Sequence, residues 1–203
     1  MNQMTREIAA AFGTAKSLIT KFFVLLAITG YFNHAHSDQV ENDPNDYSWT
    51  HRQFDESTII ASTPGITMFG DQLRIRIIKD SCDYGNLWTS VYTIPDETVS
   101  AKTFEGKKVS STFMGEKLSL PVIHAGKFIL GYLVMLDMGV YKLDTLVEIL
   151  SKHEVLEITY QDSSDFKSSN YFDIPFNSWS TLNLKDTATK ASQECKSLTR
   201  GLG

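Results

Sequence analysis

The chain has 203 residues, which fits one domain of ordinary size with a short appendage. Hydrophobic residues make up 42% and charged residues 21%, which supplies apolar material for a core and excludes a chain kept disordered by its charge. The net charge is −5, and the only adjacent basic residues are Lys107 and Lys108. Because duplex nucleic acids are bound by clustered Lys and Arg, we expect no nucleic-acid partner.

The first 37 residues have the pattern of a secretory signal peptide. A basic segment, residues 1–21, precedes an uncharged apolar segment, residues 22–32, and Ala35-His36-Ser37 then places small residues where signal peptidase reads them. We expect cleavage after Ser37 and a periplasmic or secreted protein. The alternative is a retained single-pass anchor, in which case the membrane becomes a partner; a spanning helix needs about 20 apolar residues, more than this segment offers.

Residues 38–46 are acidic and contain a proline, so they read as a flexible tether, and residues 47–203 as a single β-rich domain. The chain has two cysteines, Cys82 and Cys195. In the oxidising compartment that export implies, two lone cysteines are expected to pair. Closing so long a loop stabilises a fold by about 4–5 kcal/mol in the chain-entropy model.

The middle of the chain predicts strands. The segments with strand patterns are 47–53, 57–62, 72–78, 87–94, 99–104, 108–113, 118–123 and 128–136. Gly106 predicts a tight hairpin between 99–104 and 108–113. Pro121 suits an edge strand, and the nearly all-apolar run 128–136 predicts a strand covered on both faces.

Helical periodicity first appears after residue 139. Val140, Leu143, Val147 and Leu150 predict a helix over about 140–152. Two further strands, 155–160 and 171–175, are expected on either side of a polar loop, residues 161–170. The last element is a helix whose apolar face is Leu184, Ala188, Ala191, Cys195 and Leu198, with Asn183 as its N-cap.

These elements indicate a mainly β (α+β) fold. We expect an antiparallel β-sandwich or curved sheet of about eight strands, with the mid-chain helix and the C-terminal helix packed on the sheet.

The arrangement resembles a known group of proteins. Leu73-x-Ile75-x-Ile77 leads to Cys82, and from Asp144 the chain runs helix, strand, polar hairpin, strand, then a helix with small residues and Cys195. This is similar to small secreted or periplasmic β-domain proteins of Gram-negative bacteria, of the invasion-associated protein B kind or the type VI secretion accessory kind. The resemblance implies an envelope-located accessory or adhesion-type protein and supplies no catalytic residues. Many invasion-associated proteins have four cysteines, whereas this chain has two.

Few residues suggest chemistry. His51, His124 and His153 are isolated, without the spacing of a metal or catalytic motif, and no G-x-S-x-G elbow occurs. We therefore expect no catalytic residues, no metal and no cofactor.

The polar loop after residue 160 is the candidate binding site, because binding groups often lie on loops held by a rigid scaffold. Its candidate residues are Asp162, Ser163, Asp165, Lys167 and Tyr171. A solvated hairpin turn is the alternative. The aromatic stretch 171–179 offers a partner-binding edge, although aromatic residues more often fill cores.

The sequence thus favours an exported, non-enzymatic domain that binds a protein or another envelope component. One alternative is a small hydrolase in which His124 or His153 meets a carboxylate and a serine hydroxyl. Another is a membrane-anchored inhibitor or immunity-type protein, whose acidic domain would suit a basic partner.

Overall fold

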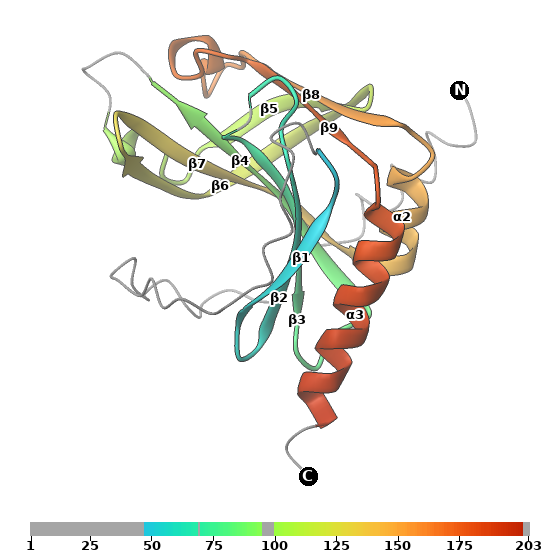
Figure 1. Ribbon diagram of the computed structural model, residues 1–203. Coiled ribbons are helices and arrows are strands. Elements are labelled where there is room, and N and C mark those ends of the chain that lie inside the picture. The colour runs from blue at the N-terminus through green and yellow to red at the C-terminus, as the bar shows by residue number, and fades with distance from the viewer. Residues whose placement is uncertain (1–46, 69, 95–99, 201–203) are drawn as a thin grey trace. The chain divides into compact units, whose positions relative to one another are not determined.

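The computed structural model describes residues 47–68, 70–94 and 100–200, without the side chains of Ala101, Thr199 and Arg200. The chain divides into two compact units between residues 46 and 47, and the described residues belong to the second unit. Within them, nine strands form one antiparallel sheet in the order β1-β2-β3-β4-β7-β6-β5-β8-β9 (Figure 1). The expected mainly β fold with two helices packed on the sheet is confirmed.

The described residues contain nine strands, two α-helices and two single turns of 3-10 helix. The strands are β1 (Thr50–Asp55), β2 (Thr58–Pro64), β3 (Gln72–Ile78), β4 (Tyr84–Thr93), β5 (Lys108–Phe113), β6 (Glu116–Phe128), β7 (Gly131–Lys142), β8 (Val155–Gln161) and β9 (Phe176–Ser180). The helices are η1 (Ala101–Thr103), α2 (Leu143–Leu150), η2 (Ser168–Asn170) and α3 (Leu184–Arg200), of which η1 and η2 are single 3-10 turns.

Three predicted elements are wrong. Residues 101–103 of the predicted strand 99–104 form η1, so the hairpin expected at Gly106 does not exist; β5 instead turns into β6 through Met114 and Gly115, both with positive φ. The predicted strand 171–175 is irregular, and β9 starts only at residue 176.

Pro121 does not lie in an edge strand. β6 is central: it pairs with β5 up to Pro121 and with β7 from Val122 onward. The β6–β7 register shifts between Val122 and His124, and proline, which has no N–H to donate, is tolerated at such an irregularity. The change of partner at this point allows the sheet to bend.

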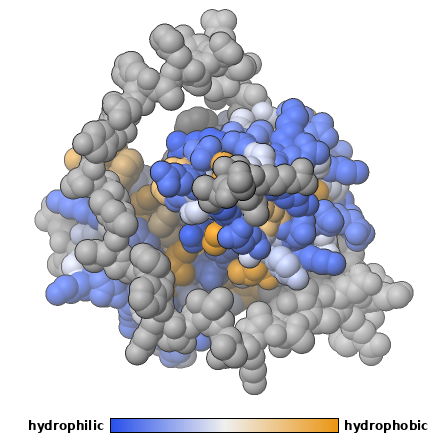
Figure 2. All heavy atoms as spheres, turned by 90° about the horizontal axis from the view of Figure 1, so that it is seen from below, coloured by the Kyte–Doolittle hydropathy of each residue, from blue (hydrophilic) through white to orange (hydrophobic). Residues whose placement is uncertain are grey.

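One continuous core fills the inner face of the bent sheet. β3 shows the expected alternation, with Leu73, Ile75 and Ile77 fully buried and the arginines between them directed outward. β8 contributes Leu156 and Ile158 to the same core. Seen from below, most of the visible described surface is hydrophilic, with hydrophobic residues in patches between (Figure 2).

The two ends of the sheet approach each other through hydrogen bonds outside the strand ladder. Ile66 N donates to Ser178 O at 2.8 Å, and Trp49 Nε1 donates to Ser180 O at 2.8 Å. These bonds hold the start of the domain and the β2–β3 loop against β9, which encloses the core although the sheet is not closed.

Asp71, in that β2–β3 loop, is a buried carboxylate only 2% exposed. It accepts hydrogen bonds from Tyr92 N at 2.6 Å and from Asn177 Nδ2 at 3.0 Å. Burial raises the pKa of Asp71 to about 6, because lost hydration outweighs the two hydrogen bonds that favour the charged form. Folding therefore carries an electrostatic penalty at neutral pH at this position.

Candidate functional site: a groove between the two helices

Helix α2 starts directly at the end of β7 and buries one face. Leu143, Leu146, Val147 and Leu150 recur at helical spacing and are all buried. The side chain of the residue before the helix makes no capping hydrogen bond. Instead, Leu143 N donates to Asp83 O at 2.9 Å, which satisfies one of the free N–H groups of the first turn.

Helix α3 packs against β1, β2 and β3 through small residues. Ala188, Ala191 and Cys195 are at most 2% exposed, and their small size lets the helix axis lie close to the sheet. Asn183 precedes the helix as expected, but with a φ of 63° rather than the extended backbone typical of an N-cap. Thr187 Oγ1 donates to Trp49 O at 2.9 Å and fixes the first half of α3 to the start of the domain.

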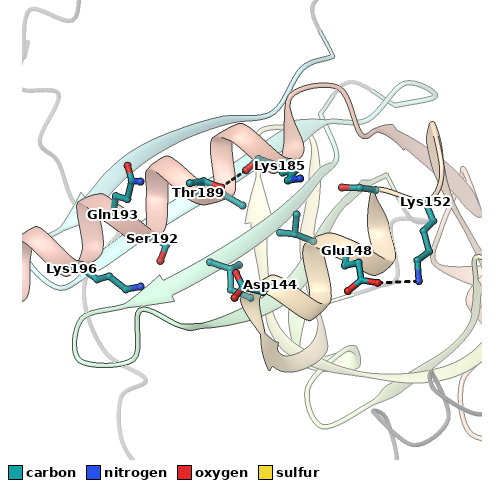
Figure 3. A pocket seen from close by; sticks show the side chains of 12 residues that line it. Asp144, Glu148, Lys152, Lys185, Thr189, Ser192, Gln193 and Lys196 are labelled. Atoms are coloured by element: carbon teal, nitrogen blue, oxygen red, sulfur yellow. Dashed lines mark hydrogen bonds and ion pairs between the residues drawn. The ribbon is translucent and has the colours of Figure 1, made fainter.

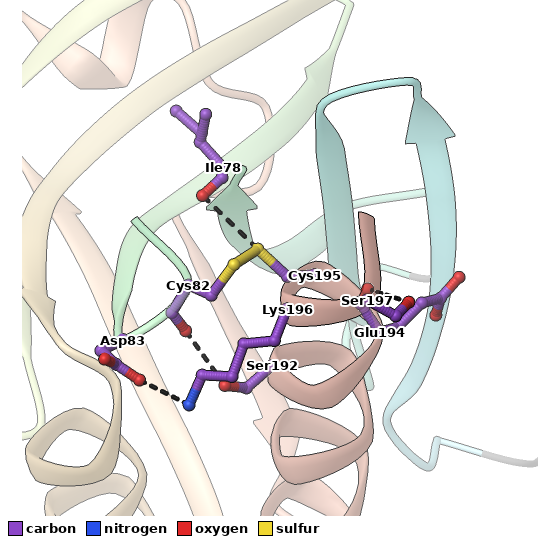
Figure 4. The surroundings of a disulfide bond; sticks show 8 residues. All are labelled: Ile78, Cys82, Asp83, Ser192, Glu194, Cys195, Lys196 and Ser197. Atoms are coloured by element: carbon purple, nitrogen blue, oxygen red, sulfur yellow. Dashed lines mark hydrogen bonds and ion pairs between the residues drawn. A yellow bond between two sulfur atoms is a disulfide. The ribbon is translucent and has the colours of Figure 1, made fainter. Parts of the chain in front are cut away.

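One turn, between β3 and β4, anchors both helices, and Figure 4 shows its contacts with α3. Cys82 forms the predicted disulfide with Cys195 of α3, with 5.7 Å between the Cα atoms. Ser192 Oγ donates to Cys82 O at 3.0 Å, and Lys196 Nζ lies 2.7 Å from Asp83 Oδ1. Because Asp83 O also accepts the hydrogen bond from α2, this turn sets the position of each helix relative to the other.

A groove of about 580 Å³ lies between the helices. Its apolar floor includes Leu143, Val147 and Ala188. Figure 3 shows Ser192 and Lys196 extending from α3 toward α2. The groove thus combines a narrow apolar floor with polar walls on rigid elements, the usual construction of a specific binding site.

The two walls carry opposite charges. α2 contributes Asp144 and Glu148, whereas α3 contributes Lys185 and Lys196, and Lys152 lies beyond the end of α2. Glu148 pairs with Lys152 at 3.5 Å. Among the described residues, no salt bridge involves Asp144 or Lys185, so these two charges are available to a ligand.

The predicted binding loop is tightly organised by its own polar groups. Asp162 accepts hydrogen bonds from Ser169 N at 2.9 Å and from Ser169 Oγ at 3.0 Å, and the backbone bond is the main cause of the lowered pKa of Asp162. Ser163 Oγ bonds the backbone of Phe166, at 3.1 Å to its N and 3.2 Å to its O. Asp165 accepts a bond from Ser164 Oγ at 3.0 Å.

The same loop is attached to the core by aromatic side chains. Tyr171 stacks on Phe166 with 4.8 Å between ring centroids, and both rings contact Phe104. Phe172 is 2% exposed, so the aromatic stretch contributes to the core there, as it does at Trp179. Lys167 is exposed. The loop contains all five candidate residues, but most of its polar side-chain atoms already make hydrogen bonds within the loop. A binding role for the loop stays a prediction.

The three histidines lie on separate elements. His51 of β1 lies 3.3 Å from Glu194 of α3, His124 is on β6, and His153 follows α2. In the part of the chain that the structure describes, no three His, Cys, Asp or Glu side chains converge in a way that could hold a metal ion.

The groove was missed by the sequence reasoning. The periodicity located both helices and their buried faces, but the polar residues beside those faces read as ordinary solvent-exposed positions. One signal for the groove was present in the sequence. Ser192 and Lys196 are close to Cys195 in the sequence, so the disulfide brings these polar side chains to the turn at Cys82.

Fold and site together define a mainly β domain with a disulfide, an open and strongly bent antiparallel sheet, and a helix-walled groove on its outside. Comparison with protein-family models, with curated proteins and with solved structures found no match. Among the described residues, no helix has the length and apolarity needed to cross a membrane.

Proposed function

We propose that this protein is an exported, non-enzymatic binding domain whose α2–α3 groove holds a helical segment of a partner protein. The leader pattern of residues 1–37 supports export to the periplasm or beyond, and so does the disulfide, since disulfides persist in oxidising compartments. The observation that carries the binding role is the groove itself, whose two walls are fixed to one turn.

The shape and lining of the groove favour a helix as its ligand. Two helices with an apolar floor between them accept a third amphipathic helix, whose anchors recur at positions i, i+3 or i+4, and i+7. Val147 and Ala188 lie at the base, and Ala188 is small enough to leave room for an inserted side chain.

The charges of the groove walls favour particular side chains along the two edges of the ligand helix. An acidic side chain along one edge would meet Lys185 of α3, and a basic side chain along the other would meet Asp144 of α2. Such complementarity sets the orientation of the ligand and the selection among partners more than it sets the affinity.

The anchoring of the helices supports this role energetically. A binding surface that is already rigid avoids the entropic cost of ordering itself when the partner arrives. The disulfide and the Lys196–Asp83 ion pair both act between α3 and the turn that also holds α2.

The test is to select helical peptides on the oxidised protein and to ask whether they occupy the groove. Peptides of about four helical turns are displayed as a library, and their dissociation constants are measured by fluorescence anisotropy. Thr189→Trp fills the groove from an exposed lining position and is expected to weaken binding about tenfold or more. Lys190→Trp, next to it on α3 but outside the groove, is the matched control and should bind as the unmodified protein does.

Selected peptides are expected to carry apolar residues at helical spacing, with acids on one edge. If the selected peptides bind Thr189→Trp and the unmodified protein equally well, the groove is not the binding site and the proposed function is wrong.

A further inference from the structure

The hairpin between β6 and β7 ends in an exposed apolar tip. Ile129 is 74% exposed and Leu130 is 81% exposed, and Phe128 just before them is 51% exposed. The sequence predicted that the run from residue 128 to 136 is covered on both faces, and for its first three residues this is wrong. Two large aliphatic side chains at the apex of a two-residue turn are the reverse of the Asn-Gly pair that such turns favour.

The backbone of the tip is also unfavourable. Ile129 has a φ of 52°, in the left-handed region where a β-branched residue is a clear outlier. Gly131, the next ladder residue, leaves no space for a Cβ because Thr93 O lies against it. Neither local conformation nor solvation explains isoleucine at position 129, and such outliers point toward functional positions.

The apolar surface continues from the tip onto the outer side of the sheet. Tyr92 of β4 packs edge-on against Phe128, with 6.1 Å between ring centroids. Ile94, at the end of β4, is 52% exposed, and Leu133 and Met135 of β7 are half-buried. This apolar tip (Ile94, Phe128, Ile129 and Leu130) is therefore one end of a larger patch.

The charges on the hairpin itself are positive, whereas Asp173, which accepts a hydrogen bond from Thr93 Oγ1 at 2.9 Å, lies at its base beside Tyr132. From Val122 to Leu136 the hairpin contains no acidic residue, and its basic groups are His124 and Lys127, both exposed. Lys102 is exposed on η1, which packs beside β6. Asp96 and Glu97 follow Ile94 in the sequence but lie outside the described residues.

We propose that this hairpin tip inserts into the surface of a phospholipid bilayer. A narrow apex exposes its side chains on several sides, so a fluid apolar medium can surround them whereas a flat protein surface covers only one side. Aliphatic side chains enter the acyl region, aromatic rings favour the interface, and lysine ammonium groups bind headgroup phosphates. Phe128, Tyr92 and Lys127 stand at the corresponding positions behind Ile129 and Leu130. The site is separate from the helix groove and goes beyond the function proposed for it.

The decisive variant is Ile129→Asn, because it separates stability from binding. Asparagine tolerates a left-handed φ, so the melting temperature is expected to rise. Loss of the aliphatic side chain from the apex is expected to lower the partition coefficient by about tenfold or more. The matched control is Leu182→Asn, which removes an aliphatic side chain 60% exposed before α3 and should leave the partition coefficient unchanged.

The full chain is expressed, and the same exported form of each variant is sedimented with phosphatidylcholine–phosphatidylglycerol vesicles. Sedimentation of the unmodified protein together with a specific loss in Ile129→Asn supports the proposal. Equal partition of Ile129→Asn and the unmodified protein overturns it, and so does an unmodified protein that stays in the supernatant. A dimer in lipid-free solution that Ile129→Asn abolishes would also overturn it, by assigning the tip to a second copy of the chain.

Leu130→Trp provides a second measurement that does not depend on loss of binding. The native tryptophans Trp49, Trp88 and Trp179 are at most 7% exposed, so an added tryptophan at the apex is the one in water. Its emission should shift to shorter wavelength when vesicles are added. An unchanged spectrum at a vesicle concentration that sediments the protein would show that another surface makes the contact.

Discussion

Removal of the Cys82–Cys195 disulfide is expected to destabilise the domain by about 4–5 kcal/mol. The bonded cysteines are 113 positions apart, and the chain-entropy model gives this figure for a loop of that length. The free energy of unfolding of a domain of ordinary size is about 5–15 kcal/mol, so loss of the disulfide would remove a large share of the stability. The bond joins α3 to the β3–β4 turn, and we expect α3 to be the first element to open when it is absent.

Three forms of the protein separate the contribution of the covalent link from that of the packed sulfur atoms: the oxidised form, the reduced form, and Cys82→Ala/Cys195→Ala. The reduced protein loses the covalent link but keeps both sulfurs in the core, where Cys195 is fully buried. The double variant also leaves a small cavity and should be the least stable of the three. Urea unfolding gives the free energies, and hydrogen exchange shows which element opens first.

A reduced form within about 1 kcal/mol of the oxidised form would refute the reasoning, because the chain-entropy effect acts on the unfolded state whatever the native contacts are. Protection of α3 that is unchanged on reduction would show that Ser192, Lys196 and the packing of Ala188 hold the helix without the bond.

Two further pairs of variants, each a test with its control, examine Asp71 and Gly131, which lie at opposite sides of β4. The pKa of Asp71 is raised on folding, so the contribution of this residue to stability should be greatest below about pH 4 and fall by about 2–3 kcal/mol as the pH rises to about 6; Asp71→Asn should remove this contribution from a urea-midpoint profile, whereas exposed Asp165→Asn should not. A difference in stability between the wild type and Asp71→Asn that stays constant over this range would contradict the buried-carboxylate account. Gly131→Ala should cost about 1–3 kcal/mol because its Cβ meets Thr93 O, and Gly70→Ala, where the Cβ makes only an ordinary contact with Tyr92, should be neutral; equal melting temperatures for the two would contradict the packing argument.

The local sequence pattern was sufficient to predict an element and its buried face where one face of the element is buried and the other is exposed to solvent. β3 and β5 begin and end at the expected residues, and the face of α3 is the predicted one, because period-two and period-3.6 patterns record burial directly. The disulfide was predicted by counting the cysteines of a chain that was expected to be exported.

Pattern failed where distant residues decide the outcome. The pattern of Tyr171 and Phe172 predicts a strand, yet these side chains join an aromatic cluster with nearby Phe166 and with Phe104, which is far away in the sequence. The apolar run from residue 128 was predicted to be buried because periodicity cannot distinguish a covered strand from an exposed apolar hairpin apex. The groove depends on how α2 and α3 cross, which no short pattern encodes.

The two proposed sites stand at opposite ends of one strand, and this makes their independence testable. β7 runs from Gly131 at the hairpin tip to Lys142, which leads into α2, a length of about 40 Å at the usual rise per residue. A domain held on a bilayer by its tip would thus present the groove away from the lipid surface. Ile129→Asn should leave peptide affinity unchanged, Thr189→Trp should leave vesicle partition unchanged, and a groove-binding peptide should sediment with protein-loaded vesicles. Vesicles that weaken peptide binding more than about tenfold would show a coupling free energy between the sites, and the strand could then no longer be regarded as a rigid spacer.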